Sequence, residues 1–253
     1  MNTWILLRGL TREAAHWGDF PAHLQQALPD ARIVLLDLPG NGQHHLDPSP
    51  TTVAGMVAAC RAAVARRGIQ TPVHLLAMSL GAMVALEWAR AAPEEVTACV
   101  LINTSVRPFS PHHHRLRPHN YPALLRLALG RISPAEAERT VLRLTSNHAH
   151  VGPPEAVIAA WTSVRALRPV SPRNALRQLL AAARYRAPAQ APGAPLLLLA
   201  STNDRLVNSR CSQALAQAWH CPLAMHPTAG HDLPLDDADW VAHQTQRWLA
   251  SLG

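Results

Sequence analysis

The stretch Val73-His-Leu-Leu-Ala-Met-Ser-Leu-Gly-Ala-Met-Val-Ala-Leu-Glu-Trp88 decides the fold of this chain. Its first half is a short apolar run, which predicts a buried strand. Its second half, from Leu80 to about Ala91, is rich in alanine and predicts a helix that Pro93 ends. Ser79 therefore lies at the junction between a strand and a helix.

Small residues flank Ser79, with Ala77 two positions before it and Gly81 two positions after it. This spacing is typical of a nucleophile elbow, a sharp turn between strand and helix that lifts one side chain above the sheet edge. The flanking positions must be small because the strand and the helix come close together there, and Ala77 adds one methyl group to the usual glycine. A serine that only caps a helix is the alternative explanation.

Strand and helix patterns alternate along most of the chain. We expect strands at 3–8, 32–37, 73–78, 96–102, 195–200 and 222–226, and helices at 21–28, 51–67, 80–91, 209–219 and 239–249. Several of these strands are continuous apolar runs, which are typical of a parallel sheet covered on both faces. The sequence therefore predicts an α/β fold with a mostly parallel sheet of about six strands.

The segment 106–187 carries no strand pattern. We expect helices at 121–129, 133–144, 154–167 and 171–184, the second opened by the capping box Ser133-Pro134-Ala135-Glu136. A chain of 253 residues is a natural length for one α/β domain with an insertion. The predicted organisation is an α/β core formed by residues 1–105 and 188–253, with an all-helical cap formed by residues 106–187.

The basic residues gather in the predicted cap. All 23 basic residues are arginine. Between residues 105 and 186 there are 13 arginines and 3 glutamates, a net charge of +10. The rest of the chain has 10 arginines and 13 acidic residues, a net charge of −3. A guanidinium-rich rim suits a substrate with its own carboxylate, or one on an acidic partner such as acyl carrier protein or coenzyme A. A solvated face is the alternative, and nucleic acid is not expected because no aromatic residues interleave the arginines.

Other function classes are excluded by what the sequence lacks. No apolar run approaches the length of a membrane span, and residues 1–10 are too short and uncharged for a signal peptide, so we expect a cytoplasmic protein without a membrane partner. The four cysteines are expected to be free thiols. His112-His113-His114 does not predict a metal site, because adjacent loop residues do not converge on one ion. We expect no metal and no cofactor, and the sequence makes no prediction of the oligomeric state.

A serine hydroxyl needs a base to take its proton and a third group to orient that base. His231, on the loop after the last predicted strand, is the candidate base. Asp204, on the loop after the 195–200 strand, is the candidate acid, since the 96–102 strand ends without a carboxylate. Both loops are expected at the edge of the sheet that carries Ser79. Asp232, beside the base, is the alternative acid, although we expect it to cap or brace its loop.

Two backbone N–H groups must receive the oxyanion of an acyl-transfer reaction. Leu80, directly after the nucleophile, and Leu10, in the loop after the first strand, are the candidates. Three side chains are candidate substrate contacts: Trp17, Met78 and Arg8. Core packing is the alternative for the first two, and for Arg8 an ion pair with a carboxylate such as Glu13.

Five pieces of this sequence, in this order, resemble the α/β-hydrolase superfamily. They are Arg8-Gly9-Leu10, Asp37-Leu38-Pro39-Gly40-Asn41-Gly42, Ala77-Met78-Ser79-Leu80-Gly81, Asp204 and Gly230-His231. The layout is similar to that of small cap-bearing carboxylesterases, such as esterases of pimeloyl-carrier-protein methyl esters, over residues 3–105 and 190–250 but not the cap. The family usually has His-Gly where this chain has Arg8-Gly9.

The resemblance implies a serine hydrolase that cleaves a carboxylic ester or thioester through an acyl-enzyme, with Ser79, Asp204 and His231 as its triad. The same triad supports hydrolysis of a C–C bond or transfer of the acyl group to another acceptor. A ligand-binding protein that keeps the fold without turnover is the alternative from another class.

Overall fold

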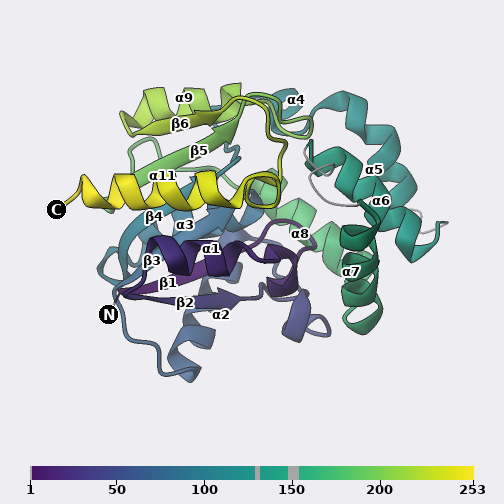
Figure 1. Ribbon diagram of the computed structural model, residues 1–253, viewed down its shortest axis with the longest axis horizontal. Coiled ribbons are helices and arrows are strands. Elements are labelled where there is room, and N and C mark those ends of the chain that lie inside the picture. Colours follow the sequence, from purple (N-terminus) through teal and green to yellow (C-terminus); the bar gives the residue numbers. More distant parts are fainter. Residues whose placement is uncertain (1, 129–131, 148–153) are drawn as a thin grey trace.

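The computed structural model describes residues 2–128, 132–147 and 154–253, which include a six-stranded sheet with helices on both faces (Figure 1). The strands are β1 (Asn2–Leu7), β2 (Ala31–Leu36), β3 (Val73–Met78), β4 (Val96–Ile102), β5 (Leu196–Ser201) and β6 (Leu223–His226). They lie in the order β2-β1-β3-β4-β5-β6, and all five neighbouring pairs are parallel. The predicted fold class is confirmed.

Alternate side chains of each central strand enter different layers of the core, because successive residues of a strand point to opposite faces. In β1, Trp4 and Leu6 pack on one face with α1 (Phe20–Ala27) and α11 (Ala238–Ala250). Ile5 and Leu7 pack on the other face, with α2 (Val53–Arg66), α3 (Leu80–Ala91) and α9 (Arg210–Trp219). Both faces of the strand are therefore buried, which explains why it reads as a continuous apolar run.

The helical insertion lies between β4 and β5. It contains α4 (His112–Arg115), α5 (Tyr121–Ala128), α6 (Pro134–Thr145), α7 (Pro154–Leu167) and α8 (Pro172–Arg184), and α5, α6 and α7 lie together on the side toward which the strands run (Figure 1). An isolated bridge between Arg107 and Arg186 joins its two ends. Within the described parts of the chain, no helix has the length and apolar character needed to cross a membrane.

The predicted bounds of the strands and helices agree with the structure to within two residues, and the helix expected over 121–129 ends in a residue, Leu129, outside the described part. The Ser133 hydroxyl caps α6 by accepting the Glu136 N–H at 3.2 Å. Six short helical segments of the described residues were not predicted: η1 (Ala14–Trp17), η2 (Gly42–His44), η3 (Pro93–Glu95), α4, η4 (Pro118–Asn120) and α10 (Leu233–Asp236). Each has only three or four residues, too few to show a helical period.

The turn between β3 and α3 brings the start of α3 against the end of β1. A Cβ atom on Gly81 would lie 2.5 Å from the carbonyl oxygen of Leu7 and 2.6 Å from that of Arg8. Both atoms belong to the backbone and cannot rotate away. Glycine at this position is therefore a requirement of the fold, as the spacing around Ser79 predicts.

We expect Gly81→Ala to lower the free energy of unfolding by about 1–3 kcal/mol, because the added methyl group overpacks this contact. Gly193→Ala is the matched control, since a Cβ there would meet nothing within 4 Å, and it should change the free energy by less than about 0.5 kcal/mol. Denaturant unfolding of both variants measures the difference. Equal free energies of unfolding for Gly81→Ala and Gly193→Ala would show that the backbone around Gly81 accommodates the methyl group at no cost.

Candidate active site

Ser79 lies in the turn between β3 and α3 with φ 54° and ψ −115°. A residue other than glycine rarely adopts a positive φ, and such conformations persist only where the surroundings impose them. Here the Ser79 N–H donates to the Ile102 carbonyl at the end of β4, at 3.0 Å. The turn holds this partly exposed serine at the carboxyl edge of the sheet, at the N-terminus of α3.

His231 and Asp204 form a buried pair. The distance between His231 Nδ1 and Asp204 Oδ2 is 2.7 Å, and the two residues are 3% and 2% exposed. The other carboxylate oxygen accepts the N–H groups of Leu206 and Val207, at 2.8 and 2.9 Å. A carboxylate anchored in this way requires the imidazole proton on Nδ1, which leaves Nε2 free to accept a proton.

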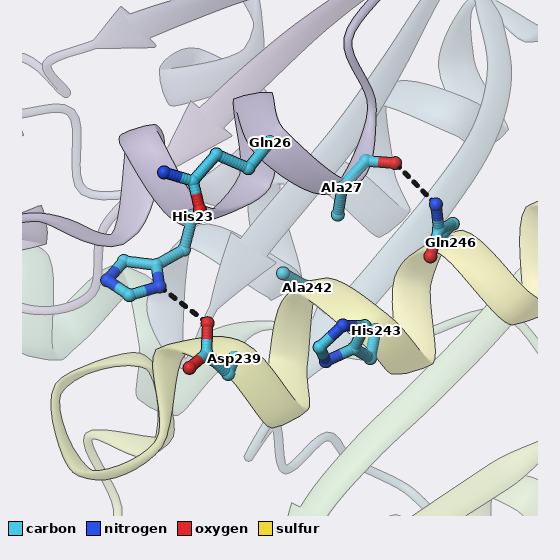
Figure 2. Close-up of a pocket in the computed structure, with 7 residues that line it drawn as sticks. All are labelled: His23, Gln26, Ala27, Asp239, Ala242, His243 and Gln246. Atoms are coloured by element: carbon cyan, nitrogen blue, oxygen red, sulfur yellow. Dashed lines mark hydrogen bonds and ion pairs between the residues drawn. The ribbon is translucent and has the colours of Figure 1, made fainter.

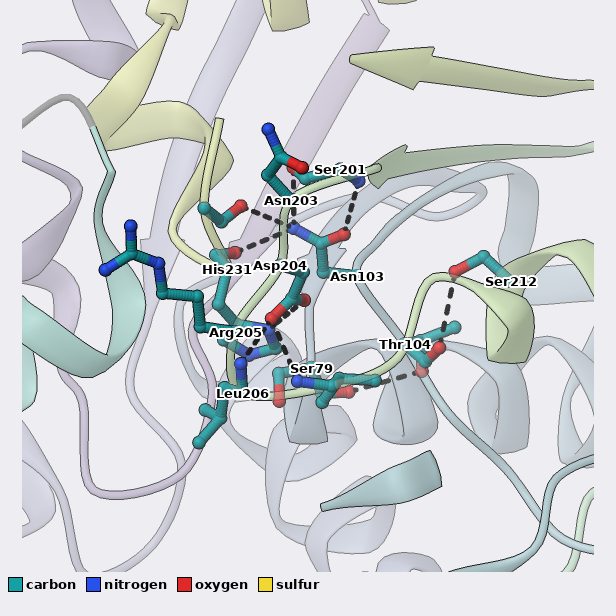
Figure 3. A network of polar contacts seen from close by, with 12 residues as sticks. Ser79, Asn103, Thr104, Ser201, Asn203, Asp204, Arg205, Leu206, Ser212 and His231 are labelled. Carbon is teal, nitrogen blue, oxygen red and sulfur yellow. Dashed lines mark hydrogen bonds and ion pairs between the residues drawn. The ribbon is translucent and has the colours of Figure 1, made fainter. Parts of the chain in front are cut away.

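Asn103 joins three strand ends in the network that Figure 3 shows. Its amide Nδ2 donates to the carbonyls of His231 and Gly230, at 2.8 and 3.2 Å, and its Oδ1 accepts the Ser201 N–H at 2.9 Å. The sequence assigned no role to this residue. Its only signal is a polar side chain directly after an apolar strand.

The end of β4 brings the serine and the histidine to one place. The carbonyl of Ile102 accepts the Ser79 N–H, and the next residue, Asn103, donates to the His231 carbonyl. Ser79, Asp204 and His231 therefore gather at this strand end (Figure 3). No hydrogen bond among the described residues joins the Ser79 hydroxyl to the imidazole, a contact that is often long without substrate.

The two predicted oxyanion donors flank the serine. Leu80 is the first residue of α3, and Leu10 follows Gly9, whose added Cβ would lie 3.1 Å from Ser79 Cβ and 3.6 Å from its Oγ. Among the described residues, the backbone hydrogen bonds of loops and helix ends include no bond donated by the Leu10 N–H or the Leu80 N–H. Within the described part of the chain, both N–H groups are thus uncommitted, one on the residue after Ser79 and the other on the residue after Gly9.

Arg8 and Asp232 form a second buried pair. Arg8 Nη1 donates to Asp232 Oδ1 at 3.0 Å and Nη2 donates to Oδ2 at 2.5 Å, and both side chains are 3% exposed. The carboxylate expected as its structural partner, Glu13, instead binds Arg168 at 2.5 Å. The Arg8 charge is therefore held by Asp232, which ties the end of β1 to the loop that carries His231.

The structure places Trp17 and Met78 in the hydrophobic core, where they are 3% and 4% exposed within one cluster. The guanidinium carbon of Arg8 lies 4.8 Å from the centre of the Trp17 ring. His112, His113 and His114 fall on α4, and the described residues contain no group of three or more side chains able to hold a metal ion.

Two pockets lie outside the immediate surroundings of Ser79. One of about 260 Å³ lies between α1 and α11, where His23 Nδ1 and Asp239 Oδ1 are 2.6 Å apart (Figure 2), and none of its lining residues is a candidate site residue. The other, of about 520 Å³, borders Asp204 and has a largely polar lining: Arg117, Asn147, Thr202, Asn203, Arg205 and Thr228. The second pocket thus adjoins the loop that carries the candidate acid.

We expect Asp232→Asn to lower the free energy of unfolding by about 3–5 kcal/mol, because it leaves the Arg8 guanidinium buried without a counter-ion. The double variant Arg8→Met/Asp232→Leu, which removes both charges, should recover most of that loss. Denaturant unfolding of the two variants tests the pair. A double variant as unstable as the single one would show that the unpaired charge is not the cause.

Comparison with known proteins identifies a matching sequence family and many solved structures with a similar fold. A profile of the alpha/beta hydrolase family matches residues 4–244. The chain is 29% identical over 234 residues to the pimeloyl-[acyl-carrier protein] methyl ester esterase of Methylococcus capsulatus, with 84% of this chain and 80% of the relative covered.

Solved structures with the same fold include the enol-lactonase from Burkholderia xenovorans LB400, with a TM-score of 0.80, 17% identity, and 98% of this chain and 91% of that chain covered. A thermophilic esterase from Thermogutta terrifontis gives a TM-score of 0.77, 20% identity, and coverage of 99% and 90%. At these identities the structural likeness shows the fold, whereas the profile spans nearly the whole chain. The chain is therefore a hydrolase enzyme and belongs to the alpha/beta hydrolase family.

Proposed function

We propose that this hydrolase cleaves a carboxylic ester or thioester through an acyl-enzyme formed on Ser79. The observation that carries the proposal is the buried pair of His231 Nδ1 and Asp204 Oδ2, 2.7 Å apart, at the same strand end as the strained serine turn. Asp204 orients the His231 ring and stabilises its imidazolium form. His231 Nε2 first accepts a proton as general base and then donates it as general acid.

The reaction proceeds in two halves. Ser79 Oγ attacks the carbonyl carbon while His231 takes its proton, and the N–H groups of Leu10 and Leu80 receive the oxyanion. Collapse of the tetrahedral intermediate expels the alcohol or thiol, which takes the proton from His231. Water then attacks the acyl-enzyme with His231 again as base, releasing the carboxylic acid and restoring the serine hydroxyl.

The helical insertion, residues 106–187, acts in this proposal as a cap over the carboxyl edge of the sheet. Its helices contact two loops at that edge, the loop after β6 and the loop after β1. Thr145 at the end of α6 accepts the Asp232 N–H at 2.7 Å, and Gln178 of α8 accepts the Thr11 N–H at 2.9 Å. The core formed by residues 1–105 and 188–253 supplies the triad.

For the substrate, we infer an acyl group that is anionic or linked to an acidic carrier. The relative's name supports this, since that protein is an esterase of a carrier-protein-linked methyl ester. Six arginines of the insertion already bind carboxylates or carbonyls of the protein: Arg115, Arg139, Arg143, Arg165, Arg168 and Arg177. Arg117 differs, because it lines the polar pocket beside Asp204 together with Arg205. These two guanidinium groups are the proposed contacts for the anion.

Replacement of the nucleophile and of the acid tests the mechanism. Ser79→Ala should lower kcat by several orders of magnitude, and Asp204→Asn by about 10,000-fold, because the asparagine reverses the ring tautomer. Asp232→Asn should cost much less in kcat at a temperature where the variant is folded. A panel of p-nitrophenyl esters and acyl thioesters of different chain lengths measures all three.

Substantial ester cleavage by Ser79→Ala would overturn the assignment of the nucleophile. A larger loss of kcat in Asp232→Asn than in Asp204→Asn would move the acid to Asp232. The same panel identifies the preferred acyl length and leaving group, and added alcohol or thiol acceptors separate hydrolysis from acyl transfer.

Ionic strength tests the proposed preference for an anionic substrate. For an anionic or carrier-linked ester, kcat/KM should fall steeply with added salt, while a neutral ester of equal length should change little, because charge steering is screened. Arg117→Gln should flatten the salt dependence, and Arg139→Gln, which removes a guanidinium already bound to Glu136, should leave it unchanged. Equal, shallow salt dependences for both esters would contradict the inference.

A further inference from the structure

The turn that carries Leu10 has a strained shape. It runs from Gly9 to Arg12 and is closed by a hydrogen bond from the Arg12 N–H to the Gly9 carbonyl at 3.2 Å. Thr11, inside the turn, has a φ of 55°. A β-branched residue adopts this left-handed conformation only where contacts from outside impose it. The direction of the Leu10 N–H therefore depends on what holds the turn.

Two amide side chains hold the backbone of the turn. The Thr11 N–H donates to Gln178 Oε1 of α8 at 2.9 Å, and the Arg12 carbonyl accepts a hydrogen bond from Asn41 Nδ2 at 2.9 Å. Gln178 Nε2 in turn donates to Asn41 Oδ1 at 2.7 Å, and Gln178 is completely buried. Asn41 lies in the loop after β2, at the start of η2 (Gly42–His44), and Gln178 lies in the helical insertion, so the two supports come from different parts of the chain.

The side chain of Arg12 is held by Glu138 of α6. Arg12 Nη1 donates to Glu138 Oε2 at 2.7 Å, and the other carboxylate oxygen accepts Arg165 Nε of α7 at 2.5 Å. Glu138 is 1% exposed, and the Arg12 guanidinium lies 4.4 Å from the centre of the Trp161 ring. Burial lowers the pKa of Arg12, while the Glu138 charge raises it. Glu138 thus compensates the buried charge of Arg12 and fixes its position.

We propose that Glu138 is a positioning residue for the hydrolase reaction, which acts through Arg12 to hold the strained Gly9–Arg12 turn with the Leu10 N–H beside Ser79. This inference rests on the proposed function, in which that N–H receives the oxyanion. It gives the insertion a part in catalysis besides covering the site, because α6 holds the oxyanion turn at Glu138 and the loop of the base at its end, where Thr145 accepts the Asp232 N–H.

The test compares two isosteric changes on one helix, Glu138→Gln and Glu136→Gln. Glu136 binds Arg139 and Arg143 on the outer side of α6, at 3.2 and 3.3 Å, so its replacement removes the same charge without touching the turn. Complete loss of an oxyanion donor costs about 100- to 1,000-fold in kcat. Partial displacement of the turn in Glu138→Gln should therefore lower kcat by about 10- to 100-fold with KM within about threefold, and Glu136→Gln should stay within about twofold of the wild type.

A second measurement separates positioning from general loosening of the cap. Ser79 Oγ adds to the carbonyl carbon of a trifluoromethyl ketone, and the ketone oxygen becomes an oxyanion. The inhibition constant of this ketone should therefore rise in Glu138→Gln by about the same factor as kcat/KM falls. The unfluorinated ketone, which does not react with Ser79, should bind the wild-type protein and Glu138→Gln about equally. Gln178→Met, which removes the acceptor of the Thr11 N–H without changing charge, should show the same selective loss if Glu138→Gln does not fold.

The outcomes that overturn the inference differ from those that overturn the proposed function. A kcat for Glu138→Gln within twofold of that for Glu136→Gln, with Ser79→Ala inactive, would refute the positioning role alone. A loss confined to KM, or equal loss of affinity for both ketones, would refute it as well. An active Ser79→Ala enzyme would overturn the proposed function and this inference together.

Discussion

The close approach of the start of α3 to the end of β1 is the constraint on which the rest of the structure depends. A Cβ on Gly81 would stand 2.5 Å from the Leu7 carbonyl oxygen. This contact forces the sharp turn that puts Ser79 at φ 54° and leaves its side chain at the carboxyl edge of the sheet. It also lays Gly9 against the serine, so that the segment after β1 becomes part of the site. The parallel order of the strands then brings the loops after β5 and β6 to the same edge.

Buried polar pairs connect these loops to one another. Asp204 and His231 join the loops after β5 and β6, Arg8 and Asp232 join the end of β1 to the loop after β6, and Glu138 joins the segment after β1 to the insertion. Pairs of this kind add little to stability against apolar replacements, since both charges lose their water. We infer that their contribution here is a fixed geometry: each pair accepts few arrangements of the two loops that it joins.

The sequence predicts the features that depend on neighbours along the chain. Apolar runs locate the strands, small residues around Ser79 locate the elbow, and strand order puts Asp204 and His231 at one edge. It could not predict contacts between distant residues. Arg8 pairs with Asp232, 224 positions away, and not with the nearby Glu13, whose carboxylate Arg168 takes. Charge counting likewise missed that six arginines of the insertion bind groups of the protein itself, and no pattern marks Asn103 as the link between three strand ends.

Covalent labelling of Ser79 tests the central claim most directly, since only a serine activated by a neighbouring base reacts readily with a fluorophosphonate. Mass spectrometry of the treated wild-type protein should show one phosphonate group per chain, located on the peptide that contains Ser79, with loss of ester cleavage at the same rate. His231→Ala should label far more slowly, and Ser79→Ala should not label at that peptide. Ester cleavage that continues without modification of Ser79, or a label carried by another residue, would contradict the account.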